Sequence, residues 1–110
     1  MTEMHDQKLP PLDKEGYLID LNDWSTAVAE QLAKAENISL SPAHWQIIDL
    51  LRAFYAQTDT APAMRALVRL TRQNLGTERG SSVYLMGLFG GSPAKAAAKV
   101  AGLPRPTNCL

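Results

Sequence analysis

The sequence predicts a mainly α-helical fold: a compact bundle of about five helices, with a small N-terminal β-hairpin and a mobile C-terminal arm. Three observations lead to this prediction. Apolar residues recur at helical spacing between residues 24 and 101. Serine–proline pairs at 41–42 and 92–93 each offer an N-cap followed by proline at the first helical position. Glycines stand where several of these segments should end.

The first 21 residues are expected to form a lead-in that holds little chemistry, residues 1–11, followed by a small hairpin, residues 12–21. Residues 1–11 are polar and end in two prolines, so we expect a loose lead-in. Residues 12–21 are predicted to form two very short strands about a turn at Gly16. Gly16 can supply the unusual backbone angle of the turn, and strand-forming side chains follow it: Tyr17, Leu18 and Ile19.

Two longer helices should come next. The first is expected from an N-cap at Asn22 or Asp23 to Asn37, because apolar residues repeat at helical spacing there: Trp24, Val28, Leu32 and Ala35. The second follows the serine–proline pair at 41–42. Its apolar surface is so broad that we expect it to be the central helix and to carry most of the core: Trp45, Ile48, Leu51 and Tyr55.

Three further helices complete the bundle. The third is expected to open at residues 60–62 and to stop at Gly76. A short apolar helix should span 82–89, and a sharp turn at residues 90–91 should lead to the last helix, 94–101. Gly102 is the expected stop of that helix.

Composition limits the functions that are open to the chain. Its 110 residues suit one domain that folds without disulfides. Eleven basic and eleven acidic residues cancel, which argues against strong general attraction to nucleic acid or anionic membrane. One cysteine and two histidines form no metal-binding cluster, so we expect no metal and no cofactor. No signal peptide or membrane span is recognisable, and we expect a cytoplasmic protein whose thiol stays reduced.

That thiol, Cys109, is the next-to-last residue of a proline-containing tail, residues 103–110. Free cysteines are usually buried, whereas chain ends fray, so we interpret this one as presented to a partner. Pro104 and Pro106 should make the tail a semi-rigid arm that reaches about 25 Å. Arg105 could favour the thiolate, but the terminal carboxylate opposes ionisation, so a partner's active site would do much of the activation. A frayed tail with an incidental cysteine is the competing interpretation.

Three stretches of sequence together resemble the DsrC/TusE family of sulfur-carrier proteins. They are KVAGLPRPTNCL at 99–110, DKEGYL at 13–18 and DLNDW at 20–24, and the resemblance extends over nearly the whole chain from Leu12. It implies a single domain over residues 1–110, with the lead-in 1–11 and the arm 103–110. It also implies that the penultimate cysteine, here Cys109, carries sulfur as a persulfide. The arm around it would be supported by Gly102, Pro104, Arg105 and Pro106.

One departure separates the branches of this family. Members that work with dissimilatory sulfite reductase carry a second arm cysteine, and at that position, eleven residues before Cys109, this chain has Ala98. A bridge between two arm thiols therefore cannot form. The resemblance is to the single-cysteine TusE branch, which takes sulfur from the TusBCD complex and passes it to the tRNA-thiolating enzyme MnmA for 2-thiouridine. The protein would then be a sulfurtransferase component with no small-molecule pocket of its own.

Other functions stay open from the sequence. A one-cysteine carrier could serve another sulfur oxidation or reduction pathway. A helix-turn-helix nucleic-acid binder would use Arg65, Arg69 and Arg72 on the outer face of the third helix, although a basic row is usually solvated surface. An adaptor could dock through the arm with an inert Cys109.

Three residues outside the arm are further candidates for a role. His44 is expected to be a polar surface residue or to make a local hydrogen bond, and not to serve as a base for the thiol, because nothing in the sequence brings it near Cys109. Tyr84 and Arg79 are placed, on position alone, where they could line a surface on which the arm docks.

Overall fold

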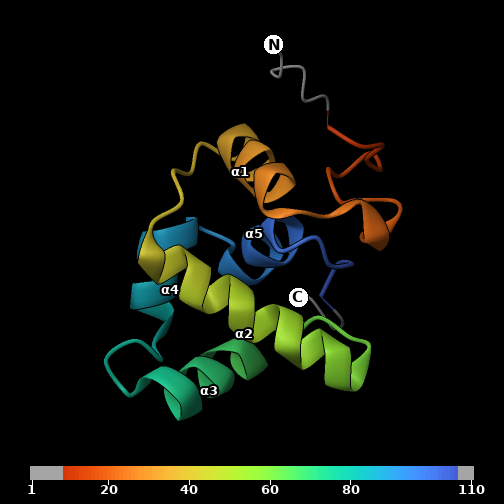
Figure 1. The fold of residues 1–110 in the computed structure, drawn as a ribbon. Coiled ribbons are helices and arrows are strands. Elements are labelled where there is room, and N and C mark those ends of the chain that lie inside the picture. Colours follow the sequence, from red (N-terminus) through yellow and green to blue (C-terminus); the bar gives the residue numbers. More distant parts are fainter. Residues whose placement is uncertain (1–8, 107–110) are drawn as a thin grey trace.

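The computed structural model describes residues 9–106, and within that range it contains five α-helices and no β-strand (Figure 1). The helices follow the order expected from the sequence: α1 (Thr26–Ala35), α2 (Pro42–Thr58), α3 (Met64–Leu75), α4 (Ser82–Phe89) and α5 (Pro93–Val100). None of them is long and apolar enough to cross a membrane.

The helix at the centre of the bundle is α5, and α2 does not have the central place that its sequence suggested. Helix α5 contacts each of the other four helices and lies in the middle of the fold (Figure 1). Its buried side chains are nearly all small: Pro93, Ala94, Ala96, Ala97, Ala98 and Val100. Small side chains let several helices pack closely around one helix. The sequence prediction relied on the spacing of large apolar residues and therefore did not detect this. Helix α2 supplies one larger buried face, Ile47, Ile48 and Leu51.

The predicted N-terminal β-hairpin is wrong. Residues 12–18 make only one antiparallel bridge, between Leu12 and Leu18. The backbone closes the turn, because the N–H of Asp13 donates to the carbonyl of Tyr17 at 2.8 Å and the N–H of Gly16 donates to that of Asp13 at 3.0 Å. The Asp13 carboxylate adds to it by accepting hydrogen bonds from the backbone N–H groups of Glu15 (2.8 Å) and Tyr17 (3.0 Å). Two prolines precede this turn and have no N–H to extend a ladder. The glycine at the turn, Gly16, does take the expected positive φ, +93°.

Helix α1 begins later than expected. Residues 21–23 form a short 3₁₀ helix, η2 (Leu21–Asp23), and Ser25 is the N-cap of α1, accepting a hydrogen bond from the N–H of Val28 at 3.1 Å. Trp24 therefore lies before the helix in an extended conformation, with φ −74° and ψ 142°. This placement frees its side chain to reach α5.

The other helix ends mostly follow the sequence signals. Ser41 caps α2, and Pro42 is its first residue. Gly76 follows α3 with φ of +99°, as expected for the stop of that helix. Gly90 follows α4 with φ of +89°, which confirms the sharp turn expected before α5. Helix α3 starts at Met64, slightly after the expected opening, and its N-cap Ala63 offers no side-chain hydrogen bond.

Candidate functional site

The candidate site is the base of the C-terminal arm, because Cys109 itself lies outside the described residues. The four predicted supporting residues, Gly102, Pro104, Arg105 and Pro106, lie within them. Gly102 and Pro106 are buried, Pro104 is half-buried and Arg105 is exposed. The first part of the predicted arm thus lies against the helical body.

The arm starts from a well-defined helix end. The N–H of Leu103 donates to the carbonyl of Ala98 at 2.9 Å, and the N–H of Gly102 donates to that of Lys99 at 3.1 Å. These two bonds, with Gly102 at φ +75°, form a Schellman motif that ends α5. Leu103 then packs into the core with 2% of its surface exposed. Ala98, where two-thiol relatives would have their second cysteine, is 1% exposed.

Trp24, from the N-terminal segment of the chain, contacts the C-terminal end of α5. Its indole Nε1 donates to the carbonyl of Val100 at 2.9 Å. The indole also covers Gly102 so closely that a Cβ at position 102 would lie 2.8 Å from the Cβ of Trp24 and nearer still to its ring. Gly102 is therefore required twice, by its backbone angle and by its neighbour.

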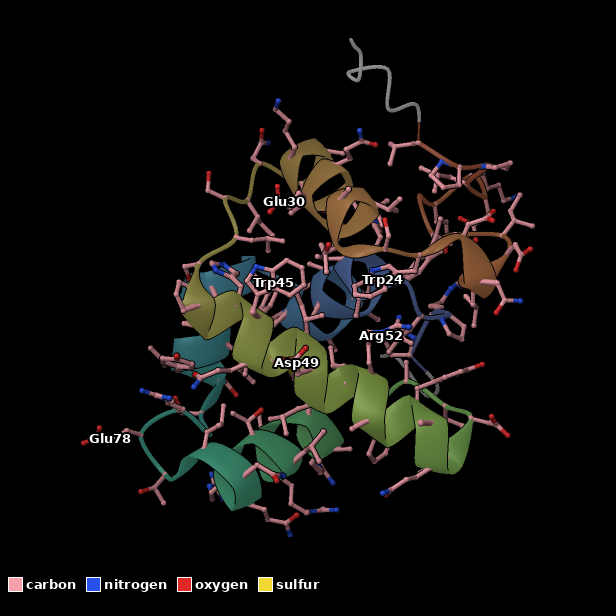
Figure 2. All side chains as sticks on the ribbon, in the orientation of Figure 1. Trp24, Glu30, Trp45, Asp49, Arg52 and Glu78 are labelled. Atoms are coloured by element: carbon pink, nitrogen blue, oxygen red, sulfur yellow. The ribbon has the colours of Figure 1, made fainter. Side chains whose placement is uncertain are left out.

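Arg52 of α2 holds the next carbonyl. Its guanidinium Nη1 donates to the carbonyl of Ala101 at 2.7 Å, and its Cζ lies 3.8 Å from the centroid of the Trp24 ring. Figure 2 shows the Trp24 and Arg52 side chains beside α5, one from the N-terminal segment and one from α2. Burial lowers the pKa of Arg52 and nearby Asp49 opposes that shift, but arginine remains a cation at neutral pH. Two side chains distant in sequence thus satisfy the last carbonyls of α5 and aim the chain that follows.

Two ion pairs join the same region to the N-terminal half. Lys99 Nζ lies 3.1 Å from Glu36 Oε2 at the end of α1 and 5.3 Å from the centroid of the Tyr17 ring. Arg105 pairs with Glu15 at 2.5 Å, with side chains 56% and 45% exposed. An exposed pair of this kind contributes about 0–1 kcal/mol, so it biases the position of the arm without locking it.

Two of the three candidate residues outside the arm make side-chain hydrogen bonds away from the arm base. His44 is buried, accepts the backbone N–H of Ser41 on Nδ1 at 3.0 Å and donates from Nε2 to the carbonyl of Leu88 at 2.7 Å. The bond to Ser41 is the local one expected, whereas the burial of His44 and its bond to Leu88 on α4 show that it is not a surface residue. Arg79 donates to the amide oxygen of Gln46 on α2 at 2.9 Å. Among the described residues, the side chains that contact the arm base come from other segments, and a docking role for Arg79 stays a prediction.

Sequence reasoning missed Arg52 and treated Trp24 as part of a helix. Arg52 lies on α2 among apolar residues, and from the sequence alone it looks like an ordinary solvent-exposed charge. Only the pairing of α2 with the end of α5 reveals its role, and a single sequence gives no signal of that contact.

The amino-acid sequence matches a known protein family and curated proteins. A family model described as DsrC-like protein matches residues 3–110. Sulfurtransferase TusE of Sodalis glossinidius is 53% identical over 98 residues, covering 89% of this chain and 91% of that protein. Sulfurtransferase TusE of Escherichia coli K12 is 46% identical over 98 residues, covering 89% and 90%.

Solved structures agree with these matches. The NMR structure of Allochromatium vinosum DsrC aligns with a TM-score of 0.82 and 47% identity, covering 90% of this chain and 88% of that one. The oxidized gamma-subunit of the dissimilatory sulfite reductase (DsrC) from Archaeoglobus fulgidus aligns with a TM-score of 0.80 and 37% identity, covering 92% of both chains.

Proposed function

The chain belongs to the family of DsrC-like proteins, and from that premise we propose that it is a sulfur-relay carrier, the sulfurtransferase component of a relay. One observation carries this function: relatives named sulfurtransferase TusE are 46–53% identical over 89% of the chain. This favours a carrier over a helix-turn-helix nucleic-acid binder.

We assign the sulfur to Cys109, the only thiol in the chain. The Cys109 thiolate attacks the outer sulfur of a donor persulfide, the donor's sulfur–sulfur bond breaks, and the donor cysteine leaves as a thiolate. Cys109 then holds a persulfide, and an acceptor thiolate takes its outer sulfur in the same way. Each step exchanges one sulfur–sulfur bond for another, so no external oxidant is needed.

The arm base supports this role by fixing where the thiol can go. Cys109 lies three residues after Pro106, which limits it to about 11 Å from that residue while 103–106 stay on the body. Release up to Gly102 would free seven residues and extend the reach to about 25 Å. The Schellman motif, Trp24 and Arg52 would keep the starting point constant in both arrangements.

Activation of the thiol is assigned to the partner. A free cysteine with a pKa of about 8.5 is only a few per cent ionised at neutral pH. Within the arm, Arg105 is the only cation, and it is paired with Glu15. Its charge is therefore partly neutralised in the docked arrangement, and the partner's own cations would have to stabilise the thiolate.

For donor and acceptor we propose a TusBCD-like complex and an MnmA-like tRNA thiolase that makes 2-thiouridine. The single-thiol arm supports this choice, because Ala98 leaves no second cysteine for a two-thiol cycle. Such a relay would run in the cytoplasm, where glutathione and thioredoxin keep thiols reduced.

Intact-mass spectrometry tests the assignment directly. The protein is incubated with a cysteine desulfurase, cysteine and a small sulfur-relay donor, alongside Cys109→Ser. The expected result is a gain of one sulfur, about 32 Da, that a reductant reverses and the serine variant lacks. An equal gain in the serine variant would exclude Cys109 as the carrier. No gain with several competent donors would instead favour an adaptor that docks through its arm.

A further inference from the structure

A basic groove lies on the molecule away from the arm base. It is bounded by α3 and by the starts of α4 and α5, and its volume is about 1090 Å³. Four cationic side chains line it and no acidic side chain does: Arg65, Arg69, Arg72 and Lys95. We call this feature the basic groove.

The four charges of the basic groove are not neutralised by the ion pairs found among residues 9–106. Those pairs join Lys99 to Glu36 and Arg105 to Glu15. Arg72 donates from Nη2 to the carbonyl of Gly80 at 3.1 Å, which positions its guanidinium but leaves the charge in place. The groove therefore concentrates positive potential in a concave surface.

The zero net charge of the chain hides a strong separation of charge. Residues 60–110 contain seven basic residues and one acidic residue, whereas residues 1–59 contain four basic and ten acidic residues. The two parts thus carry formal charges of +6 and −6. The one acidic residue after position 60, Glu78, lies on the connection after α3 and points outward from the edge of the molecule (Figure 2). Lys99 and Arg105 form the ion pairs at the arm base, which leaves five of the seven basic residues outside those pairs, so the zero net charge of the chain does not oppose the binding of a polyanion in the groove.

The lining of the groove fits phosphates better than a protein segment. Arg65, Arg69 and Arg72 form a row that rises about 10 Å along α3, suited to a series of regularly spaced anions. Ser82 and Ser92 add hydroxyl groups, and no aromatic residue lines the groove. Arginine, lysine and serine are typical phosphate ligands, whereas protein interfaces usually centre on aromatic anchors.

We propose that the basic groove binds the phosphate backbone of the RNA whose base receives the sulfur. This inference rests on the proposed function. The groove reaches the start of α5 and the arm leaves its end, about 12 Å away along an eight-residue helix. RNA in the groove would leave the arm base uncovered.

Four phosphate contacts give only weak binding that depends strongly on salt. The binding becomes stronger when the acceptor enzyme holds both the arm and the RNA, because the contact between the groove and the RNA then forms within one complex. The groove would orient the carrier on the enzyme–RNA complex and would not by itself select a sequence.

Fluorescence anisotropy with a fluorescein-labelled, unmodified tRNA transcript and the full-length protein tests the proposal. We expect binding whose log K falls with log salt at a slope of about −3, as about four phosphate contacts would give. Arg69→Glu should weaken binding about tenfold or more. Lys34→Glu, which changes charge equally at an exposed site on α1, should change binding less than twofold. Arg69→Gln should reduce the slope by about 0.7–0.9.

Three outcomes would overturn the proposal: no binding by the wild-type protein at 50 mM salt, equal losses in the Arg69 and Lys34 variants, or an Arg69→Glu defect in binding the RNA-free acceptor enzyme with RNA binding unchanged. The last would assign the groove to an acidic protein surface. Persulfide loading of Cys109 requires no RNA and is measured on the same samples. Normal loading without RNA binding removes the groove proposal alone, whereas absent loading removes the proposed function.

Discussion

At Gly102 the chain leaves α5 with φ of +75°, and the Trp24 side chain fills the space that a Cβ would need. The same residue supplies one of the two hydrogen bonds of the Schellman motif. A single glycine thus sets both the end of the central helix and the direction of the segment that leads to Cys109. The sequence pattern identified Gly102 as a helix stop, but it could not identify the tryptophan above it.

Replacing Gly102 by alanine should destabilise the protein by about 2–4 kcal/mol. The left-handed angle costs about 1–2 kcal/mol for a residue with a Cβ, and the overlap with Trp24 adds a packing penalty. Urea unfolding followed by circular dichroism measures the difference. Gly87→Ala is the matched control, because Gly87 lies within α4 and no neighbouring atom lies within 4 Å of the position that a Cβ would take there. That variant should be more stable by about 0.5–1 kcal/mol. Equal effects at the two positions would contradict the packing argument.

At the scale of elements, the helices were predictable and the N-terminal segment was not. Helix ends depend on local chemistry, such as the Ser41 cap with Pro42 or the glycines after α3 and α5, and local chemistry is readable in one sequence. The hairpin does not extend beyond one bridge, because the Asp13 carboxylate accepts the N–H of Tyr17 and the two prolines before the turn have no N–H to pair. The central position of α5 depends on small side chains, which carry little periodic signal.

The Asp13 turn predicts a response to acid. Hydrogen bonds from backbone N–H groups, that of Tyr17 first, lower the pKa of Asp13, and the charge of Arg105 adds to this effect. Because the pKa of Asp13 is lower in the folded than in the unfolded protein, its ionised carboxylate adds to the free energy of unfolding at any pH above its ordinary pKa. This contribution is lost as the pH falls below about 4 and through the lowered, folded-state pKa. Carboxyl NMR should give an Asp13 pKa below its ordinary value.

In the same titration the Tyr17 amide resonance should shift with the same midpoint, because its N–H loses a charged acceptor. Asp13→Asn should keep the turn and remove this pH dependence between about pH 2 and 5. A Tyr17 amide that titrates equally in the asparagine variant would show that another group is responsible.

For the whole molecule, the arm base and the basic groove lie at opposite ends of α5 and use different chemistry. The base is held by Trp24 and Arg52, from segments that are distant in the sequence, and the groove gathers cations from α3 and α5. The sequence predicted the row of three arginines on α3, but it could not add Lys95 to that row or bring Trp24 and Arg52 together, because these groupings depend on how helices cross. The arm motif could be recognised early because all its residues are adjacent in the chain.

This arrangement predicts that the length of the arm matters more than the identity of its middle residues. Deleting residues 107–108 would shorten the reach of Cys109 by about 7 Å, so the thiol should fall short of an acceptor cysteine held in a cleft. Replacing the same two residues by Gly-Ser keeps the length and should leave transfer within about threefold of wild type, because a flexible linker of equal length has a similar reach. Single-turnover transfer of ³⁵S from preloaded carrier to the acceptor enzyme measures this, and loading by a small-molecule persulfide controls for an intact thiol. If the deletion and the replacement transferred sulfur at the same rate, reach from the fixed base could not be what limits the relay, and the acceptor would have to come to the body of the carrier.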